Sequence, residues 1–400
     1  MSTNNSPLTF LCVSCEFKGV DFIRYCKNEG NKVYLVTSKN LEDKDWPRDM
    51  LDDIFYVEAS ELCVWNMKDV IAGLAHFMRS NPVDRIVALD DFDVEKAALL
   101  REHFRIPGMG QTTQRYFRDK LAMRMKAQEA GIAVPPFSPL FNDEQVNEYA
   151  RTVSPPWVVK PRAEASTVGI RKVHSAEELW NVLHELGEDR HQYLVEQFKP
   201  GDVYHADALS FNGKLVFCRV SRYLNTPFEV AQGGGIFRSQ TVEFGSADDK
   251  AIQKMNAQVM KAFGMQFSAS HTEYIRSKED GQFYFLETAS RVGGANLAEM
   301  VEASSGINLW GEWARLETAQ AREGAYKPPK ARKDHAGIIV SLSRFQHPDS
   351  SAFNDPEVCW RMQKDYHIGL ILQSKSTERI KTLLDDYAER VFRDFHASIS

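Results

Sequence analysis

Strand and helix signals alternate over the first 110 residues, and this alternation restricts the fold more than any other feature of the chain. Short apolar runs typical of strands occur at 9–13, 32–37, 54–57 and 85–89. Between them, apolar residues recur at helical spacing in segments such as 20–28, 65–80 and 94–104. Strands separated by helices usually pair in parallel, because each connecting helix covers one face of the sheet. We therefore expect an N-terminal parallel α/β domain over residues 1–112.

The loops after the first and fourth strands carry polar residues at the expected carboxyl edge of this sheet. The first strand leads into Ser14-Cys-Glu-Phe-Lys-Gly19, which lacks the Gly-x-Gly-x-x-Gly fingerprint of dinucleotide-binding domains. A nicotinamide-dependent oxidoreductase is therefore disfavoured. Asp90-Asp-Phe-Asp93 follows the fourth strand, where acidic side chains either contact a substrate or cap the next helix. Capping is favoured, since a helical segment begins directly afterwards.

The rest of the chain divides into a large middle region and a short C-terminal one. Residues 113–324 mix helices with strands that can form hairpins, and residues 155–198 are expected to form a smaller lobe within them. A Pro- and Lys-rich linker begins at Ala325 and precedes further strand and helix signals. We therefore expect a small α+β appendage over residues 325–400.

Two glutamates, Glu273 and Glu287, occupy strand-like segments that should pair as a hairpin. Mg²⁺ takes hard oxygen ligands, commonly one or two carboxylates together with substrate phosphates. To share a metal, both side chains must lie on one face of the sheet, and side chains alternate between faces along a strand. A two-residue turn at Asp280-Gly281 would place them on opposite faces. We therefore predict an odd-length loop or a β-bulge between the two glutamates.

Arg291 follows Glu287 by four residues and precedes Gly293-Gly294 and a helical segment that starts near Asn296. A guanidinium binds carboxylates and phosphates through two parallel N–H donors. The free N–H groups and the positive dipole at a helix N-terminus also favour anions. We interpret Arg291, Gly293 and Gly294 as a site for a substrate carboxylate or its acyl phosphate, with an ordinary salt bridge and turn as the alternative.

Two lysines have neighbours that suit a nucleotide phosphate. Lys120 lies in a segment, 114–130, that we expect to form one helix, and Lys160 ends a short buried strand. The loop after Lys160 is rich in small residues, among them Ser166, Thr167 and Gly169. Backbone N–H groups and hydroxyls in such a loop can bind phosphate oxygens, and a lysine adds a positive charge. The Gly-Lys-Ser/Thr sequence of a Walker A loop is absent.

Glu196-Gln-Phe198 ends an apolar strand, where an acidic side chain and neighbouring backbone groups could recognise an adenine amino group. These three residues alone fit an ordinary edge strand better.

Taken in order, these motifs resemble those of the ATP-grasp superfamily, in particular its biotin carboxylase-like and L-amino-acid-ligase-like carboxylate–amine ligases. The resemblance covers about residues 8–320, and its motifs are these: Arg118-Asp-Lys120, Val158-Val-Lys-Pro161, the loop 163–169, Val195-Glu-Gln-Phe198 and Phe285-Leu-Glu-Thr-Ala-Ser-Arg291. It implies a parallel-sheet domain followed by two α+β lobes that enclose ATP. It further implies phosphate binding by both lysines, an adenine hinge at 196–198, magnesium (with Mn²⁺ as another candidate) at both glutamates, and stabilisation of the acyl phosphate by Arg291.

Two positions depart from the pattern of the superfamily. The metal-binding asparagine usual two residues after the second glutamate is Ala289 here, so either a water replaces it or one metal site is weaker. The usual ribose-binding glutamate falls at Val203, so Asp202 or His205 is expected to take that contact.

The charge distribution and the apolar runs exclude some partners. The net charge is −6 with no clustered basic face, which argues against a nucleic-acid partner. No apolar run reaches the length of a membrane span, and the polar N-terminus does not look like a secretory signal. The six scattered cysteines are expected to be buried thiols in a reducing cytoplasm. A homodimer is a possible assembly.

The resemblance predicts an ATP-dependent, ADP-forming ligase that activates a carboxylate as an acyl phosphate and joins it to an amine, as an amino-acid or dipeptide ligase does. Two alternatives share the same fold. One is a bicarbonate-activating carboxylase or nucleotide-pathway ligase, which would differ in the acceptor pocket. The other is a non-catalytic ATP-binding regulatory protein, a reading that Ala289 leaves open.

Overall fold

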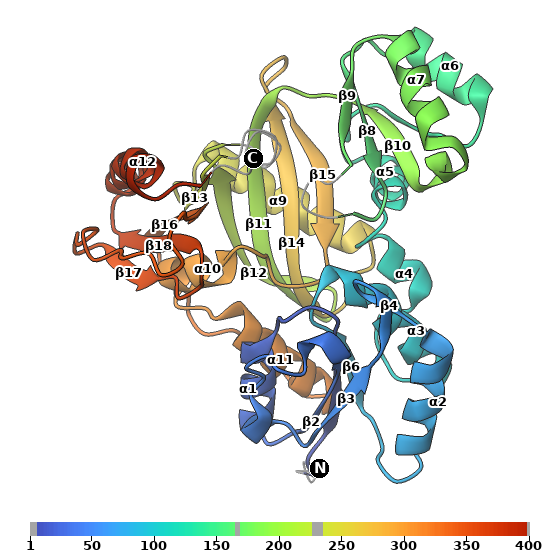
Figure 1. The fold of residues 1–400 in the computed structure, drawn as a ribbon, viewed down its shortest axis with the longest axis vertical. Helices are drawn as coiled ribbons and strands as arrows, with labels where there is room; N and C mark the ends of the chain where they lie inside the picture. Colours follow the sequence, from blue (N-terminus) through green and yellow to red (C-terminus); the bar gives the residue numbers. More distant parts are fainter. Residues whose placement is uncertain (1–5, 165–168, 226–234, 398–400) are drawn as a thin grey trace.

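The computed structural model describes residues 6–164, 169–225 and 235–397. The N-terminal region forms a four-stranded sheet in the order β3-β2-β1-β6, and all three strand pairs in it are parallel. Its elements are β1 (Thr9–Ser14), α1 (Val20–Asn28), β2 (Lys32–Ser38), β3 (Asp53–Val57), α2 (Met67–Phe77), β6 (Arg85–Ala88) and α3 (Val94–Phe104). Figure 1 shows this domain below the other sheets. The predicted parallel α/β fold is confirmed.

Several small elements were not anticipated from the sequence. They are β4 (Ala59–Glu61), β5 (Val64–Trp65), β7 (Phe137–Pro139), β17 (Val358–Arg361) and the short helices η1 (Lys39–Leu41), η2 (Arg48–Met50), η3 (Asp91–Asp93) and η4 (Gly187–Gln192). Each spans only a turn or one short strand, too few residues to show a hydrophobic period.

The segment 114–130 forms two helices rather than the single one predicted. α4 (Gln111–Arg115) ends before Asp119, and α5 (Lys120–Glu129) begins directly after it. The side chain of Asp119 accepts hydrogen bonds from the backbone N–H groups of Leu121 and Ala122. An aspartate in this position caps a helix N-terminus, so Lys120 is the first residue of α5.

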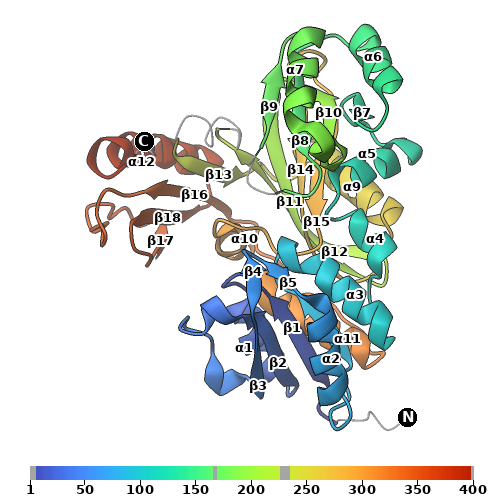
Figure 2. The same cartoon turned by 45° about the vertical axis from the view of Figure 1, so that its right-hand side comes forward.

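The smaller lobe is a four-stranded antiparallel sheet in the order β7-β10-β8-β9. Its further elements are α6 (Asp143–Thr152), β8 (Trp157–Pro161), β9 (Arg171–Val173), α7 (Ala176–Leu186) and β10 (Tyr193–Gln197). The side chain of Ser175 accepts a hydrogen bond from the N–H of Glu178 and caps α7. The helices lie on the outer side of this lobe, away from the large sheet (Figures 1 and 2).

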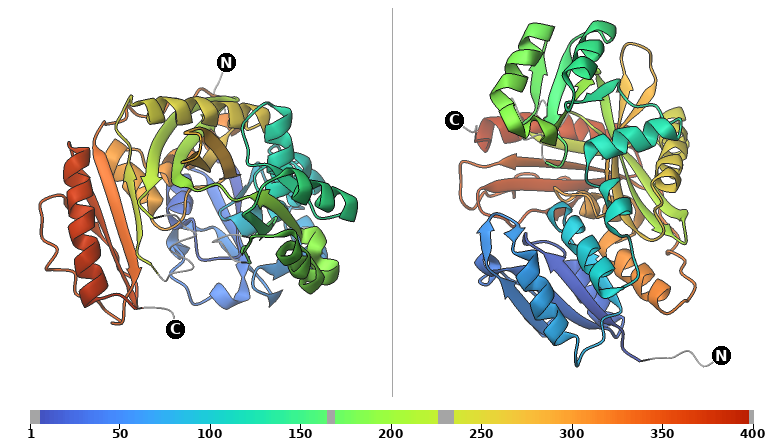
Figure 3. Two further views of the ribbon diagram at one scale, coloured as in Figure 1. Left: turned by 90° about the horizontal axis from the view of Figure 1, so that it is seen from above. Right: turned by 90° about the vertical axis from the view of Figure 1, so that its right-hand side faces the viewer.

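An eight-stranded sheet in the order β15-β14-β11-β12-β13-β16-β18-β17 forms the centre of the molecule. Its other elements are β11 (Gly201–Phe211), β12 (Lys214–Tyr223), β13 (Phe237–Thr241), α9 (Ala247–Ala262), β14 (Ser268–Ser277), β15 (Phe283–Ala289), α10 (Leu297–Ser305), β16 (His335–Leu342), β18 (His367–Ser374) and α12 (Thr377–Asp394). The C-terminal α+β region therefore extends this sheet through the pairing of β16 with β13. Figure 3 shows α12 lying along these strands.

Helix α11 (Leu309–Ala321) joins the large sheet to the N-terminal domain. It packs against α1, where Gly311 lies so close to the ring of Tyr25 that a Cβ would be 2.9 Å from it. The Asn31 side chain donates a hydrogen bond of 2.8 Å to Thr318 Oγ1. One hydrophobic core contains residues of β1, α1, β11, α10 and α11. The N-terminal domain is thereby packed against the large sheet through α1 and α11.

The cysteines differ in part from expectation. Cys15 and Cys63 form a disulfide that links the end of β1 to the β4–β5 hairpin, so the prediction of free thiols is wrong for these two. Cys12 and Cys26 are buried thiols as predicted, and burial raises the pKa of both. The sequence could not indicate the pair, because the hairpin that carries Cys63 was not recognised.

Among the described residues, no helix combines the length and the apolar character needed to cross a bilayer.

Candidate active site

The two predicted metal ligands lie directly opposite each other on β14 and β15. Glu273 pairs with Glu287, whereas the next residue, Tyr274, pairs with Phe285. Leu286 is thus the extra residue of a β-bulge, and the bulge returns both carboxylates to one face of the sheet. The predicted irregularity between the two glutamates is confirmed. The pair satisfies the geometric condition for a shared metal.

Each glutamate has one close polar neighbour that orients it. The Tyr223 hydroxyl donates a hydrogen bond of 2.8 Å to Glu273 Oε1. Lys120 Nζ lies 3.0 Å from Glu287 Oε2 and donates to the backbone carbonyl of Glu164 at 2.7 Å. Burial would raise the pKa of Glu287, but Lys120 and Lys160 together outweigh it and hold the pKa below its usual value. Lys120 therefore connects the start of the small-residue loop to the candidate metal site.

Lys160 belongs to a buried ionic network that the sequence did not reveal. Its ammonium contacts Glu196 Oε1, and Arg124 Nε lies 2.9 Å from Glu196 Oε2. Arg124 also donates to the backbone carbonyl of Leu286 in the bulge of β15. Arg124 follows Lys120 by four positions on α5, so both side chains lie on one face of the helix. This spacing is the only feature of the sequence that could have pointed to Arg124. The network fixes α5 between the smaller lobe and the metal-binding hairpin.

Burial lowers the pKa of Lys160 to about 8, since the neighbouring Glu196 only partly offsets the loss of solvation. Below this value the side chain is charged, and above it the ammonium loses its proton. We expect the affinity for ATP to fall about tenfold as the pH rises from about 7 to about 9, because the hydrogen bond from a charged donor to phosphate is lost. Calorimetric titration with ATP across this range measures the effect.

The Lys160→Gln variant is the control for this pH dependence, because glutamine has no charge to lose. Its affinity should be low and nearly constant with pH. A wild-type affinity that is flat over the same range would contradict the prediction.

The adenine hinge predicted at 196–198 is partly engaged within the protein. The carboxylate of Glu196 is fully used by Lys160 and Arg124, as described above. The N–H of Gln197 donates to Pro136 O at 2.8 Å, and that of Phe198 donates to Pro156 O at 3.0 Å. The role of this segment in binding adenine therefore stays a prediction, carried by backbone carbonyls and apolar neighbours rather than by the Glu196 side chain.

The structure describes only some of the other residues that the sequence predicts to contact the nucleotide. Ser166 and Thr167 lie outside the described residues. Gly169 has a φ of +72°, and a Cβ there would lie 2.9 Å from the Pro161 ring, so the backbone at Gly169 lies close to the end of β8. Asp202 is exposed at the start of β11, and its ribose contact stays a prediction.

His205 does not suit the predicted ribose contact. Its side chain is completely buried, and both ring nitrogens are occupied by Asp207 Oδ2 and Ser239 Oγ, each at 2.7 Å. The prediction fails because the ring, although it lies on the same face as its strand partner Glu273, is covered completely and has no nitrogen left for a ribose hydroxyl. Asp202 pairs with Arg276 and lies on the opposite face from Glu273, so the ribose contact is not assigned to a residue here.

Arg291 faces the N-terminal domain at the end of β15. One Nη contacts the carboxylate of Asp91, and the other donates to the Val292 carbonyl at 2.8 Å. Its Nε is buried and has no hydrogen-bond partner among the described residues. Burial would raise the pKa of Asp91, but Arg291 outweighs it and holds the pKa below its usual value. The sequence reading of Asp91 as a helix cap missed this pair, whereas Asp90 does cap η3.

Gly293 and Gly294 follow Arg291 in the chain, and Gly293 lies against the side chains of Asp207 and His271. A Cβ at Gly293 would lie 2.8 Å from Asp207 Oδ1 and 2.9 Å from His271 Nδ1, whereas one at Gly294 would meet open space. Burial would lower the pKa of His271, but Asp207 and Glu273 raise it to about 10. The surroundings of His271 therefore strongly favour a positive charge.

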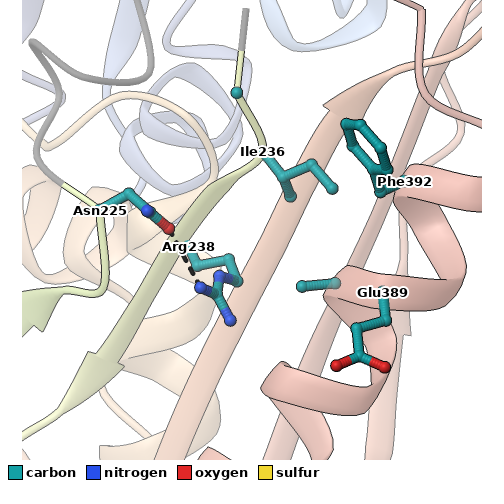
Figure 4. A pocket seen from close by; sticks show the side chains of 7 residues that line it. Asn225, Ile236, Arg238, Glu389 and Phe392 are labelled. Atoms are coloured by element: carbon teal, nitrogen blue, oxygen red, sulfur yellow. Dashed lines mark hydrogen bonds between the residues drawn. The ribbon is translucent and has the colours of Figure 1, made fainter. Parts of the chain in front are cut away.

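A surface pocket of about 330 Å³ lies between β13 and α12 and is shown in Figure 4. Arg238 crosses it, donating to Asn225 Oδ1 at 3.1 Å and to Asp385 Oδ1 at 2.8 Å. None of the predicted site residues line it, so it does not belong to the candidate active site.

Comparison with known proteins gives matches along most of the chain. A family model described as the C-terminus of D-Ala–D-Ala ligases matches residues 127–225. The L-arginine-specific L-amino acid ligase of Bacillus subtilis is 26% identical over 246 residues, or 59% of this chain and 58% of that protein. A D-alanine–D-alanine ligase of Neisseria gonorrhoeae is 22% identical over 206 residues, or 50% and 67% of the two chains. The chain thus spans little more than half of the Bacillus relative.

Solved structures match over almost the whole length. The L-amino acid ligase of Bacillus licheniformis superimposes with a TM-score of 0.73 at 18% identity, covering 99% of this chain and 100% of that one. The biotin carboxylase domain of the Hydrogenobacter thermophilus 2-oxoglutarate carboxylase, solved with MgADP and bicarbonate, gives 0.71 at 15% identity, covering 99% and 92%. With its parallel N-terminal domain and two further lobes, the chain has the ATP-grasp fold of these two structures.

Proposed function

We propose that this protein is an ATP-dependent, ADP-forming ligase that joins a carboxylate to an amine. The observation that carries the proposal is the arrangement at the end of the β14–β15 hairpin. Glu273 and Glu287 share one face, and the same strand leads on to Arg291, which faces Asp91. Carboxylates for a metal, lysines for phosphates and an arginine for the acyl group are the components that phosphoryl transfer to a carboxylate requires.

Glu273 and Glu287 would hold magnesium, and the donor set fits, since Mg²⁺ prefers one or two carboxylates together with phosphate oxygens. A bound magnesium would neutralise phosphate charge during transfer. Lys120 already lies beside Glu287, and we propose that its ammonium turns to the phosphates when ATP enters. Lys160 is held by Glu196 and would bind phosphate from a fixed position.

Arg291 would bind the substrate carboxylate before transfer and the acyl phosphate after it. The amine then attacks the acyl carbon, the C–O bond to phosphate breaks, and inorganic phosphate leaves with the proton that the nitrogen gives up. Arg291 stabilises negative charge on the oxygens through this step, because its donors are already in place and buried.

The pairing of Arg291 with Asp91 further supports an α-amino acid as substrate. A zwitterion offers a carboxylate for the guanidinium and an ammonium for the aspartate, and could replace both ends of this ion pair. L-Amino acid and D-alanine ligases among the similar proteins support the same class of substrate.

The Asp91→Asn variant tests this substrate class. We expect KM for the amino acid to rise about 10- to 100-fold, since a charged hydrogen bond of about 1.5–3 kcal/mol is lost, while KM for ATP stays unchanged. Glu95→Gln, an exposed glutamate one turn further on, is the matched control and should behave as wild type. An unchanged KM for the amino acid in Asp91→Asn would show that Asp91 does not bind the substrate.

The overall function is tested by phosphate release from Mg-ATP with amino acids and small carboxylates, singly and in pairs. Release that requires a carboxylate and an amine together, with one condensation product per phosphate, supports the ligase. Release with bicarbonate alone would point to a carboxylase instead. No substrate-stimulated release, together with measurable ATP binding, would support a regulatory ATP-binding protein.

A further inference from the structure

We propose that Nε2 of His271 is a third protein ligand of the metal held by Glu273 and Glu287. The inference rests on the proposed function, because it takes the two glutamates as metal ligands. It answers the question raised by Ala289, which stands where the superfamily pattern has a metal-binding asparagine.

The register of the hairpin places His271 directly opposite Ala289, whose methyl side chain cannot bind a metal. His271 and Ala289 are direct partners across β14 and β15, two residues beyond the pair formed by Glu273 and Glu287. Because side chains alternate along each strand, all four positions point to one face of the sheet. Directly paired residues have Cβ atoms about 4.5–5.5 Å apart. A ligand lost from β15 can therefore be supplied from β14 at nearly the same place.

The distance between His271 and Glu273 is short enough for the two side chains to share a metal. His271 Nε2 lies 3.7 Å from Glu273 Oε1 and 3.4 Å from the Tyr223 hydroxyl. Two ligand atoms with bonds of about 2.1 Å to one metal lie at most about 4.2 Å apart. Nε2 and Oε1 can thus bind the same ion with little movement, and Tyr223 already fixes that carboxylate oxygen.

The other ring nitrogen of His271 is held as in a typical metal-binding histidine. Nδ1 lies 2.8 Å from Asp207 Oδ1, and the other oxygen of Asp207 is bound by His205 at 2.7 Å. A metal-binding imidazole usually donates its second N–H to a carboxylate, which fixes the tautomer and directs the remaining lone pair. Donation from Nδ1 to Asp207 leaves Nε2 as the ligand atom.

The buried cluster of His205, Asp207 and His271 could itself be read as a metal site, since its ligand atoms all lie within 4.8 Å of one another. However, His205 uses both ring nitrogens and Asp207 both oxygens in hydrogen bonds. The cluster is therefore better explained as the support that orients His271. Gly293 packs directly on Asp207 and His271, so the same support contacts the acyl-binding loop.

An imidazole ligand changes which metal the site prefers. Carboxylate and water oxygens suit Mg²⁺, whereas imidazole nitrogen suits later and softer divalent ions, and affinity for such sites rises from Mn²⁺ onward along the first transition row. We therefore expect the protein to favour Mn²⁺ over Mg²⁺ more strongly than a site built from two glutamates and an asparagine would.

The test is Mn²⁺ binding to the full-length protein with ADP present, followed by electron paramagnetic resonance. Pulsed measurements detect a nitrogen bonded to Mn²⁺, and labelling with ¹⁵N-histidine identifies it as imidazole. We expect this coupling in the wild type, its loss in His271→Ala, and an affinity for Mn²⁺ reduced about tenfold or more. His271→Gln, which keeps most of the volume, repeats the test should alanine disturb the fold. A wild type without histidine coupling, or a coupling that persists in both variants, would overturn the inference.

Two further variants separate this inference from the proposed function. Glu287→Gln should weaken Mn²⁺ binding whether or not His271 is a ligand. If Glu287→Gln weakens binding and His271→Ala does not, only the role of His271 is wrong. If neither variant has an effect, the metal site assigned to this hairpin is wrong as well. The double variant His271→Ala/Ala289→Asn moves the ligand to the other strand, and we expect it to regain Mg²⁺ binding without nitrogen coupling.

Discussion

Replacing Arg291 by alanine is expected to lower the rate of substrate-dependent phosphate release about 100- to 1,000-fold, while ATP affinity changes less than about twofold. The size follows from the loss of a preorganised donor to a developing oxyanion in a site shielded from water. The side chain of Arg291 is only 16% exposed, so water has little access to take over its role after the substitution. Its Nε has no hydrogen-bond partner among the described residues and is free to donate to the substrate. Initial rates of phosphate release and calorimetric titration with ATP measure the two effects.

Arg276→Ala is the matched control for this experiment. Arg276 lies on the same hairpin, but its side chain is 46% exposed and pairs with Asp248. Its removal should leave the rate within about twofold, since exposed ion pairs contribute at most about 1 kcal/mol. Near-normal turnover in Arg291→Ala would show that the acyl site has been assigned to the wrong arginine.

Replacing Glu196 by alanine is expected to reduce the free energy of unfolding by about 3–5 kcal/mol. The carboxylate is buried between Arg124 and Lys160, so its removal leaves two buried cations without their partner. The loss should appear as a lower urea midpoint with an unchanged slope. Weaker ATP binding should accompany it, because Lys160 would no longer be held in place.

Glu279 supplies the control, since its side chain is 53% exposed in its pair with the partly buried Lys199. Glu279→Ala should cost at most about 1 kcal/mol. Equal losses in the two variants would mean that the buried network adds nothing beyond a surface ion pair.

The pH dependence of this stabilisation follows from the pKa of Glu196. Burial would raise that pKa, but Arg124 and Lys160 outweigh it and lower it below the value in the unfolded chain. The contribution of Glu196 is therefore complete above its unfolded pKa and is lost as the pH falls through its folded pKa. The difference in stability between wild type and Glu196→Ala should accordingly shrink in acid.

Local patterns in the sequence were sufficient to predict the parallel N-terminal sheet and the irregularity between the two glutamates. In the first case strands and helices each have their own hydrophobic period, and their alternation restricts the topology. In the second, the two-residue period of a strand decides which positions share a face, so the requirement that Glu273 and Glu287 meet predicted a bulge. Both inferences need only neighbouring residues.

Contacts between distant segments were decided by the tertiary structure alone. Asp91 and Arg291 stand 200 positions apart and meet because the N-terminal domain packs against the large sheet through α1 and α11. The Cys15–Cys63 disulfide likewise depends on an unrecognised hairpin. Nothing in the sequence indicated that His271 lies opposite Ala289, because the register of β14 and β15 decides which residues pair. Periodicity shows which face of an element is buried, but not which other element covers it, because that depends on the packing of all layers together.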